Sequence, residues 1–240
     1  MSRNIAVIFA GGSGRRMNAG SVPKQFLKLH GKPIIAYTLE LFDSHPEIDA
    51  IYVACIEQWI PQLQQIVQQY AFKKVVKIVA GGETGQDSIY NGLKAATEGD
   101  DGESIVLIHD GVRPLIDSQT ISENIREARA YGNCITCVPA TETFVVHQPD
   151  ETLQIPSRED SLIARAPQTF RLAEIVEAHR QARQEGRHDF IDSLTLMSHY
   201  GFKAHTIIGP SENIKITTPT DYFVFKAIVE ARENSRIFGL

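Results

Sequence analysis

Cysteine is scarce in this chain of 240 residues, and its three copies are an odd number. An odd, small number of cysteines does not make a disulfide framework, which excludes the small secreted folds that depend on one. Cys134 and Cys137 form a single C-x-x-C, but a zinc site needs two further ligands and no second Cys or Cys/His pair has matching spacing. We therefore interpret both as buried thiols of a strand and expect a reducing compartment.

Long hydrophobic runs are also absent. The first apolar stretch, residues 5–10, stops at Gly11 and Gly12 and is too short for a signal-peptide core or a membrane span. We therefore expect a cytoplasmic protein with no membrane partner.

An excess of positive charge is missing as well. The chain has 24 basic and 29 acidic residues, for a formal net charge of −5. A general nucleic-acid binder needs a basic surface to displace phosphate counterions, so we expect no nucleic-acid partner. The net charge does not exclude a local basic pocket for a small anion.

Several familiar motifs do not occur. There is no Walker A loop, and a dinucleotide fingerprint starting at Gly12 would need a glycine where Met17 stands, which argues against an NAD-dependent dehydrogenase. The eight histidines show no metal-binding spacing such as H-E-x-x-H, and no G-x-S-x-G nucleophile elbow is present.

What the chain does contain is a regular alternation of strand and helix patterns. Hydrophobic residues make up 42% of the sequence, enough for a sizeable core. We predict strands at 5–9, 50–56, 75–80, 104–108, 133–139 and 204–208, and helices at 33–42, 61–70, 87–96, 118–131, 172–185, 192–200 and 219–232. Continuous apolar strands alternating with helices predict an α/β, Rossmann-like fold with a mostly parallel sheet covered on both faces.

The polar segment 141–165 interrupts this alternation. It contains two short alternating pieces around a turn at 148–150, which predicts a β-hairpin arm that protrudes from the main sheet. No linker marks a domain boundary, so we expect residues 1–240 to form a single domain with this arm.

Two glycine-rich segments follow predicted strands, where ligands of parallel sheets bind. The first, Ala10-Gly-Gly-Ser-Gly-Arg-Arg-Met17, is followed by Pro23-Lys-Gln25, and its amides and cations suit a triphosphate. The alternative is a glycine turn with solvated basic residues. The second is Gly81-Gly82 with Ser88, where close backbone approach suits a flat base; Ser88 could equally cap the helix.

Charged residues mark the remaining candidate segments. Asp110 ends a predicted strand and suits Mg²⁺, although Arg113 could instead hold it in an ordinary ion pair. Lys215, between two apolar strand residues, and Arg158, on the arm, are each cleft cations or surface charges by their local pattern alone.

Taken in order, these segments resemble the methylerythritol phosphate / ribitol phosphate cytidylyltransferase family over nearly the whole chain. The matching segments are Ala10–Met17, Pro23–Gln25, Gly81-Gly82 with Ser88, His109-Asp110-x-x-Arg113-Pro114, Ala166-Pro-Gln-Thr-Phe170 and Asn213-Ile-Lys-Ile-Thr217. The resemblance implies a sheet of the nucleotide-diphosphate-sugar transferase type and a homodimer whose arm reaches the partner's active site. It also implies the reaction of CTP with an alditol phosphate to give a CDP-alditol and pyrophosphate, with Mg²⁺ as cofactor.

The resemblance also assigns roles to individual residues. It implies that phosphates are bound by the catalytic cations Arg16, Lys24 and Lys215. The nucleotide would contact Ala10, Gly11, Gly12, Gly14, Gly82, Ser88 and Asp110, with Asp110 also the metal ligand. The alditol phosphate would lie near Arg113, Thr143 and Arg158.

Departures from the family pattern bear on the substrate. Gly85 stands where methylerythritol phosphate enzymes usually have Arg, and Ile191-Asp192 where they have Thr-Asp. The Thr218-Pro219 pair and the longer tail from Ala231 resemble the ribitol phosphate branch, so D-ribitol 5-phosphate is favoured over methylerythritol phosphate or another alditol phosphate.

Two other functions remain to be weighed. A sugar-1-phosphate nucleotidyltransferase usually has a longer stretch before its Pro-Lys than the five residues from Asn18 to Val22. An inactive nucleotide-binding scaffold is disfavoured because Lys24, Asp110 and Lys215 are all present.

Overall fold

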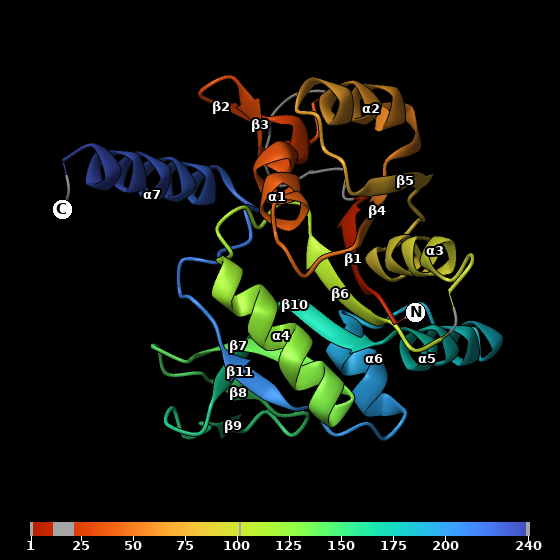
Figure 1. The fold of residues 1–240 in the computed structure, drawn as a ribbon. Coiled ribbons are helices and arrows are strands. Elements are labelled where there is room, and N and C mark those ends of the chain that lie inside the picture. The colour runs from red at the N-terminus through yellow and green to blue at the C-terminus, as the bar shows by residue number, and fades with distance from the viewer. Residues whose placement is uncertain (1, 12–21, 101, 239–240) are drawn as a thin grey trace.

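The computed structural model describes residues 2–11, 22–100 and 102–238, and its main feature is one seven-stranded sheet (Figure 1). The strand order is β11-β7-β10-β6-β1-β4-β5. The strands are β1 (Asn4–Ala10), β4 (Ala50–Cys55), β5 (Val75–Ala80), β6 (Ile105–Asp110), β7 (Asn133–Pro139), β10 (Leu162–Arg171) and β11 (Thr206–Ile208). Short β2 (Lys28–Leu29) and β3 (Lys32–Pro33) form a separate antiparallel pair.

Helices connect the strands. They are α1 (Ile34–Asp43), α2 (Ile60–Gln69), α3 (Gly85–Ala96), α4 (Ser118–Tyr131), α5 (Leu172–Gln184), α6 (Ser193–His199) and α7 (Pro219–Phe238), with short 3₁₀ turns η2 (Lys24–Phe26) and η3 (Glu57–Trp59). The predicted elements therefore exist, with ends displaced by a few residues. The N-cap of α4 is Asp117, whose side chain accepts a hydrogen bond from the Thr120 amide.

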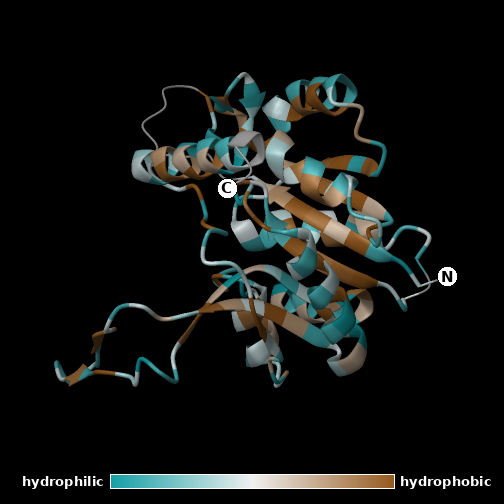
Figure 2. Ribbon diagram, turned by 60° about the vertical axis from the view of Figure 1, so that its left-hand side comes forward, coloured by the Kyte–Doolittle hydropathy of each residue, from teal (hydrophilic) through white to brown (hydrophobic). Residues whose placement is uncertain are grey.

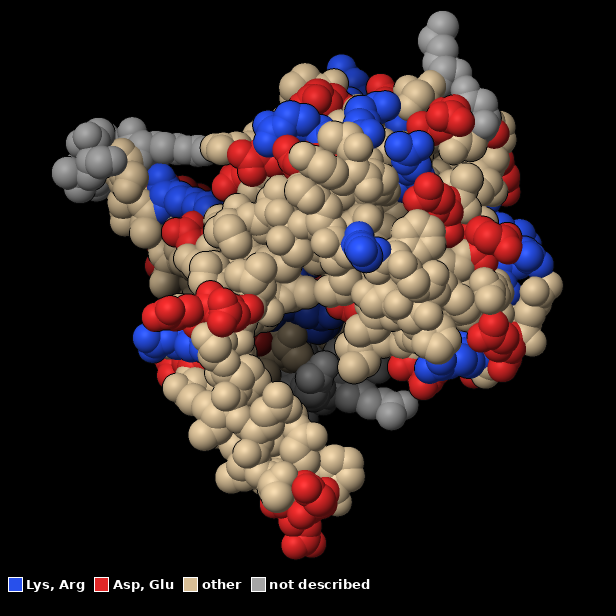
Figure 3. Space-filling model, turned by 90° about the horizontal axis from the view of Figure 1, so that it is seen from below, with Lys and Arg blue, Asp and Glu red and all other residues tan. Residues whose placement is uncertain are grey.

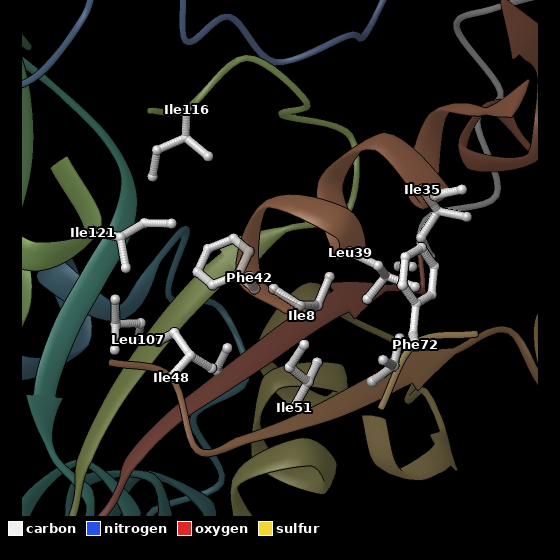
Figure 4. Packing of buried hydrophobic residues seen from close by; sticks show 14 of the residues in the cluster. Ile8, Ile35, Leu39, Phe42, Ile48, Ile51, Phe72, Leu107, Ile116 and Ile121 are labelled. Carbon is white, nitrogen blue, oxygen red and sulfur yellow. The ribbon is translucent and has the colours of Figure 1, made fainter. Parts of the chain in front are cut away.

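Alternate residues of each central strand supply two separate cores. Ala6 and Ile8 of β1 pack in a cluster with α1, α2 and α4, which Figure 4 shows around Leu39 and Phe42. The intervening residues Ile5 and Val7 pack in a second cluster with α3, α5 and α6. A strand buried on both faces needs apolar residues at successive positions, which explains the continuous hydrophobic runs.

Strand β10 is the feature that the sequence pattern did not predict. It lies between β6 and β7 and runs antiparallel to both, whereas β1–β4, β1–β6, β4–β5 and β7–β11 are parallel pairs. The sheet is therefore mostly parallel, as expected. A proline such as Pro167 within an apolar run argues against a central strand, so the local pattern does not favour one here. The strand accommodates it where its register with β7 shifts between Ala164 and Gln168.

The predicted arm is present as a hairpin that extends away from the body (Figure 2). Its strands are β8 (Val146–His147) and β9 (Leu153–Gln154), paired antiparallel. Residues 162–165, which the prediction included in the arm, belong instead to β10. Among the helices of the described residues, none combines the length and the apolar character that crossing a bilayer requires.

Candidate active site

A pocket of about 310 Å³ lies where strands β1, β6 and β10 meet the loop before α6. Its charged lining residues are Asp110, Arg113, Arg165, Asp192 and Lys215, and its uncharged ones are Phe9, Gly85, Ile89, Ile108, Ala164, Ala166, Gln168, Ile191 and Ser193. Viewed from below, the molecule is hollowed beside the base of the arm, and Lys or Arg atoms lie inside the hollow (Figure 3). The pocket therefore gathers segments from the start, the middle and the last third of the chain.

Asp110 is the central charge of this pocket. One carboxylate oxygen lies 2.6 Å from Lys215 Nζ and the other 2.8 Å from Arg113 Nε. Burial opposes ionisation of this carboxyl, but the positive charges of Arg113 and Lys215 outweigh it and lower its pKa to about 2. Asp110 is thus a fixed anion that holds two cations at the end of β6.

The loop that follows β11 joins three of the sequence segments. Arg113 Nη1 donates to the Asn213 carbonyl at 2.9 Å, and the Asn213 side-chain amide donates to the Ala166 carbonyl at 2.6 Å. Two residues farther on, Lys215 reaches Asp110. The family resemblance identified these segments but not the contacts between them. The structure shows that they lie together.

A second cluster forms at the adjacent ends of β1 and β5. The Gly82 amide donates to Ser88 Oγ at 3.0 Å, and Ser88 Oγ donates to the Thr84 carbonyl at 2.9 Å. A Cβ at Gly11 would lie 2.5 Å from Ser88 Oγ, so a glycine is required there for the strand ends to approach. The N-cap of α3 is Thr84, so Ser88 does not cap this helix by its side chain.

The Pro23-Lys-Gln25 segment packs beside the end of β1. Gln25 Nε2 donates to the Ala10 carbonyl at 2.6 Å, which fixes turn η2 against this strand. Lys24 is buried in the same turn. Burial opposes ionisation of Asp221, but the amides of the turn before α7 and the charge of Lys24 lower the Asp221 pKa. Gly12, Gly14 and Arg16 lie outside the described residues.

Thr143 and Arg158 are both exposed on the arm. Neither lines the pocket of its own chain. The structure of one chain therefore does not bring these two predicted residues to this pocket.

Several pocket residues were not among the predicted ones. Gln168 of β10 donates to Asp192 Oδ2 at 2.9 Å and accepts from the Leu194 amide at 2.8 Å, which fastens the start of α6 to the sheet. Asp192 also caps α6 by accepting from the Thr195 amide. Arg165 lies on the same strand as Gln168. The available signal in the sequence was the presence of three polar side chains, Arg165, Gln168 and Thr169, inside an otherwise apolar run.

The donor set fits a metal ion only in part. The described residues contain no group of three or more His, Cys, Asp or Glu side chains placed to hold an ion. Both oxygens of Asp110 already contact cations. Because Mg²⁺ often binds through one or two carboxylates and the substrate's phosphates, Asp110 suits an ion that arrives with a triphosphate rather than a preformed protein site.

Comparison with known proteins shows which family this chain is similar to. Residues 4–231 match the family described as 2-C-methyl-D-erythritol 4-phosphate cytidylyltransferase (IspD). The chain is 48% identical to a ribitol-5-phosphate cytidylyltransferase of Vibrio parahaemolyticus, over 98% of this chain and 100% of that protein. It is 47% identical to one of Streptococcus agalactiae serotype III, over 99% and 100% of the two chains.

More distant relatives carry the other substrate name. A 2-C-methyl-D-erythritol 4-phosphate cytidylyltransferase of Clostridium botulinum is 38% identical over 96% of this chain and 99% of that protein. Among solved structures, 4-diphosphocytidyl-2C-methyl-D-erythritol synthase of Anaerococcus prevotii superposes with a TM-score of 0.81 at 25% identity, covering 95% of this chain and 96% of that chain.

Proposed function

Because the chain belongs to the 2-C-methyl-D-erythritol 4-phosphate cytidylyltransferase (IspD) family, we propose that it joins CMP from CTP to D-ribitol 5-phosphate, releasing pyrophosphate. The observation that carries the chemistry is the pocket at the strand ends, where Lys215 and Arg113 flank Asp110. The higher identity to ribitol-5-phosphate cytidylyltransferases, 48% against 38%, favours ribitol phosphate as the acceptor.

The reaction needs positioning and charge neutralisation rather than a covalent enzyme intermediate. An oxygen of the alditol phosphate attacks the α-phosphorus of CTP, a P–O bond forms, and the bond from the α-phosphorus to the bridging oxygen of the leaving pyrophosphate breaks. Negative charge accumulates at the five-coordinate phosphorus and on the leaving group. Fixed cations beside these atoms lower the barrier because they need no reorganisation during the step. We assign this role to Lys24, Lys215 and Arg16.

The glycine cluster supplies the nucleotide side of the proposal. The backbone around Gly11 and Gly82 packs closely, with the Ser88 hydroxyl hydrogen-bonded to the Gly82 amide, and this close approach supports a role in holding a flat base. We assign cytosine recognition to Gly82 and Ser88, and contacts with the rest of the nucleotide to Ala10, Gly11, Gly12 and Gly14. Asp110 contacts Lys215 and Arg113, and we assign it to the ribose side of the nucleotide.

The arm supplies the reason to propose a homodimer. Its exposed residues include the large apolar side chains Phe144, Val145, Val146, Leu153 and Ile155. Several exposed large apolar side chains on one protruding segment are typical of a protein interface. We assign Thr143 and Arg158 to the alditol phosphate site of the partner subunit, beside the partner's Arg113.

Mg²⁺ completes the proposed site. Asp110 is the residue that would hold it, together with the phosphates of CTP, and the ion would neutralise charge on those phosphates. Chelation by EDTA should therefore abolish turnover, and added Mg²⁺ should restore it. The same EDTA should leave the melting temperature of the ligand-free protein unchanged, because no described cluster binds an ion on its own. Turnover that survives EDTA would remove Mg²⁺ from the proposal.

The state of the three thiols indicates the kind of cellular compartment that suits the protein. Cys55, Cys134 and Cys137 are all buried and free, and burial raises the pKa of Cys55 to about 12 and that of Cys134 to about 12. Unpaired thiols are typical of a reducing compartment, in agreement with a cytoplasmic enzyme.

The deciding experiment is a comparison of acceptors. Purified protein is given CTP and Mg²⁺ with D-ribitol 5-phosphate, with 2-C-methyl-D-erythritol 4-phosphate, or with neither, and pyrophosphate release is followed. We expect kcat/KM to be highest for ribitol 5-phosphate. A preference for methylerythritol phosphate would overturn the substrate and retain the reaction class. No acceptor-dependent pyrophosphate from any alditol phosphate would favour a nucleotide-binding scaffold.

A further inference from the structure

The charges that line the pocket do not balance. Three cations, Arg113, Arg165 and Lys215, face two carboxylates, Asp110 and Asp192. Asp110 pairs with Arg113 and Lys215. The carboxylate of Asp192 accepts hydrogen bonds from Gln168 and from the first turn of α6. Within the described part of the chain, Arg165 is therefore the pocket cation that no carboxylate neutralises.

The surroundings of Arg165 make this excess charge costly. Its Nη1 donates to the Ser211 carbonyl at 2.8 Å, on the same loop whose Asn213 carbonyl accepts from Arg113. Burial, and secondarily the positive charge of Arg113, lower the pKa of the Arg165 guanidinium. A guanidinium remains charged in proteins and has five donors, so one carbonyl contact leaves most of its hydrogen-bonding capacity free. A bound anion would relieve both the repulsion and the missing hydrogen bonds.

A buried hydroxyl lines the same pocket. Ser193 is only 2% exposed, and its Oγ has no hydrogen-bond partner among the described residues. Buried polar groups are normally paired, and an exception in a pocket points to a partner that the protein itself does not provide. The pocket thus presents an unneutralised cation and an unpaired hydroxyl, which together suit a molecule carrying both a phosphate and hydroxyl groups.

We propose that Arg165 binds the phosphate of the alditol phosphate within its own subunit, and that Ser193 Oγ hydrogen-bonds a hydroxyl of the same molecule. This inference rests on the proposed function. It adds a contact from the sheet of the same chain to those assigned to the partner's arm, and it places the phosphate beside Arg113. A planar guanidinium binds phosphate oxygens in a bidentate manner, which orients the acceptor as well as attracting it.

The alternative is that Arg165 only fastens β10 to the loop at Ser211. Steady-state kinetics of Arg165→Gln distinguish the two roles. A hydrogen bond to a charged group is worth enough that its loss should raise KM for ribitol 5-phosphate roughly 10- to 100-fold. KM for CTP and the melting temperature should stay close to the wild-type values. Arg165→Lys keeps the charge and should recover part of the loss.

Arg171→Gln is the matched control, because Arg171 lies exposed at the other end of the same strand and does not line the pocket. It should leave both KM values unchanged. Ser193→Ala should raise KM for the alditol phosphate by a smaller factor than Arg165→Gln. Equal changes in both KM values together with a lower melting temperature, or an unchanged KM for ribitol 5-phosphate, would overturn the assignment of Arg165.

Inhibition by inorganic phosphate is a second test of the phosphate contact, because it measures the binding of the anion in both the wild type and the variant. As an inhibitor competitive with ribitol 5-phosphate, inorganic phosphate should bind Arg165→Gln more weakly than wild type by a similar factor. Equal inhibition of both proteins would contradict the phosphate contact. Wild-type protein without alditol-dependent turnover would instead contradict the proposed function, so the two failures are separate results.

Discussion

At the scale of single residues, the site depends on charges that are held in place before any ligand arrives. The pKa of Asp110 is lowered to about 2 because Arg113 and Lys215 outweigh the cost of its burial. The carboxyl therefore stays ionised throughout the neutral range, and its partners keep their positions. Preorganised cations of this kind are more effective than mobile ones because the protein has already ordered them during folding.

Replacing one of these cations tests the assignment. Lys215→Ala and Lys24→Ala should each lower kcat by roughly 10² or more, because each removes one preorganised electrostatic contact from the transition state. The measurement is pyrophosphate release at saturating CTP and ribitol 5-phosphate. Lys226→Ala is the control, because Lys226 is exposed on α7 and pairs with Glu230. Wild-type turnover in both site variants would remove these lysines from the mechanism.

Gly82 tests the close approach in the nucleotide cluster. A Cβ there would lie 2.2 Å from Asp87 Cβ, whereas a Cβ at Gly85 would meet nothing within 4 Å. Gly82→Ala should lower the free energy of unfolding by about 1–3 kcal/mol, the usual cost of overpacking. Gly85→Ala should change it by less than about 0.5 kcal/mol. Urea unfolding followed by circular dichroism measures both, and equal stability of the two variants would contradict the packing.

At the scale of elements, the arm and β10 form one continuous segment of the chain. The arm leaves the sheet after β7 and returns as β10, which carries Arg165 and Gln168 into the pocket. Insertion of an antiparallel strand between β6 and β7 thus connects the protruding hairpin directly to the site. Contacts that fix the position of the arm therefore also affect the positions of Arg165 and Gln168.

Mixing two inactive variants tests whether the arm acts on the partner. Arg158→Ala has a defective arm and an intact pocket, and Lys215→Ala has the reverse. After subunit exchange, half of the dimers are mixed and each contains one complete site, so activity should return to about a quarter of the wild-type rate. Mixing Lys215→Ala with Lys24→Ala is the control and should recover nothing, because both defects lie in the body of the chain. Failure of the first mixture despite demonstrated exchange would exclude an arm acting in trans.

At the scale of the whole molecule, two helical layers enclose the sheet and bury ionisable groups with it. His179 of α5 is 2% exposed and neither ring nitrogen has a hydrogen-bond partner among the described residues. Burial lowers its pKa to about 4, with Arg183 adding to the effect and Asp87 opposing it. Tyr90 of α3 stacks on the ring at 5.8 Å. The layer of α3 and α5 therefore requires a neutral imidazole.

The layered packing predicts an acid-sensitive stability. Because the folded pKa of His179 lies below the unfolded value of about 6.5, this group's stabilising contribution is present above pH 6.5 and is lost as pH falls toward 4. His179→Leu cannot titrate at this position. The free energy of unfolding of the variant should therefore rise relative to that of wild type by roughly 2 kcal/mol when the pH is lowered from 8 to 5. Urea unfolding of both proteins at the two pH values measures this, and a pH-independent difference would contradict it.

Much of the fold could be predicted from local pattern. The continuous apolar runs at β1, β4, β5, β6 and β7 reflect burial on both faces, and that requirement acts on each strand separately. The family-like segments likewise identified Asp110, Arg113 and Lys215, which the structure brings within hydrogen-bond distance. Strand β10 could not be predicted in this way, since its proline and polar residues are accommodated only by its neighbours.

By itself, the sequence determined most of the segments that form strands and helices, β10 excepted, and which residue types stand at the ends of those strands, because periodicity and glycine content act over a few neighbouring positions. Only the tertiary structure decided that Arg165, Gln168 and Ser193 face the same pocket as Asp110, and that no described carboxylate neutralises Arg165. Those relations join residues far apart along the chain, and contacts at such separations exist only after the sheet has placed its strands side by side.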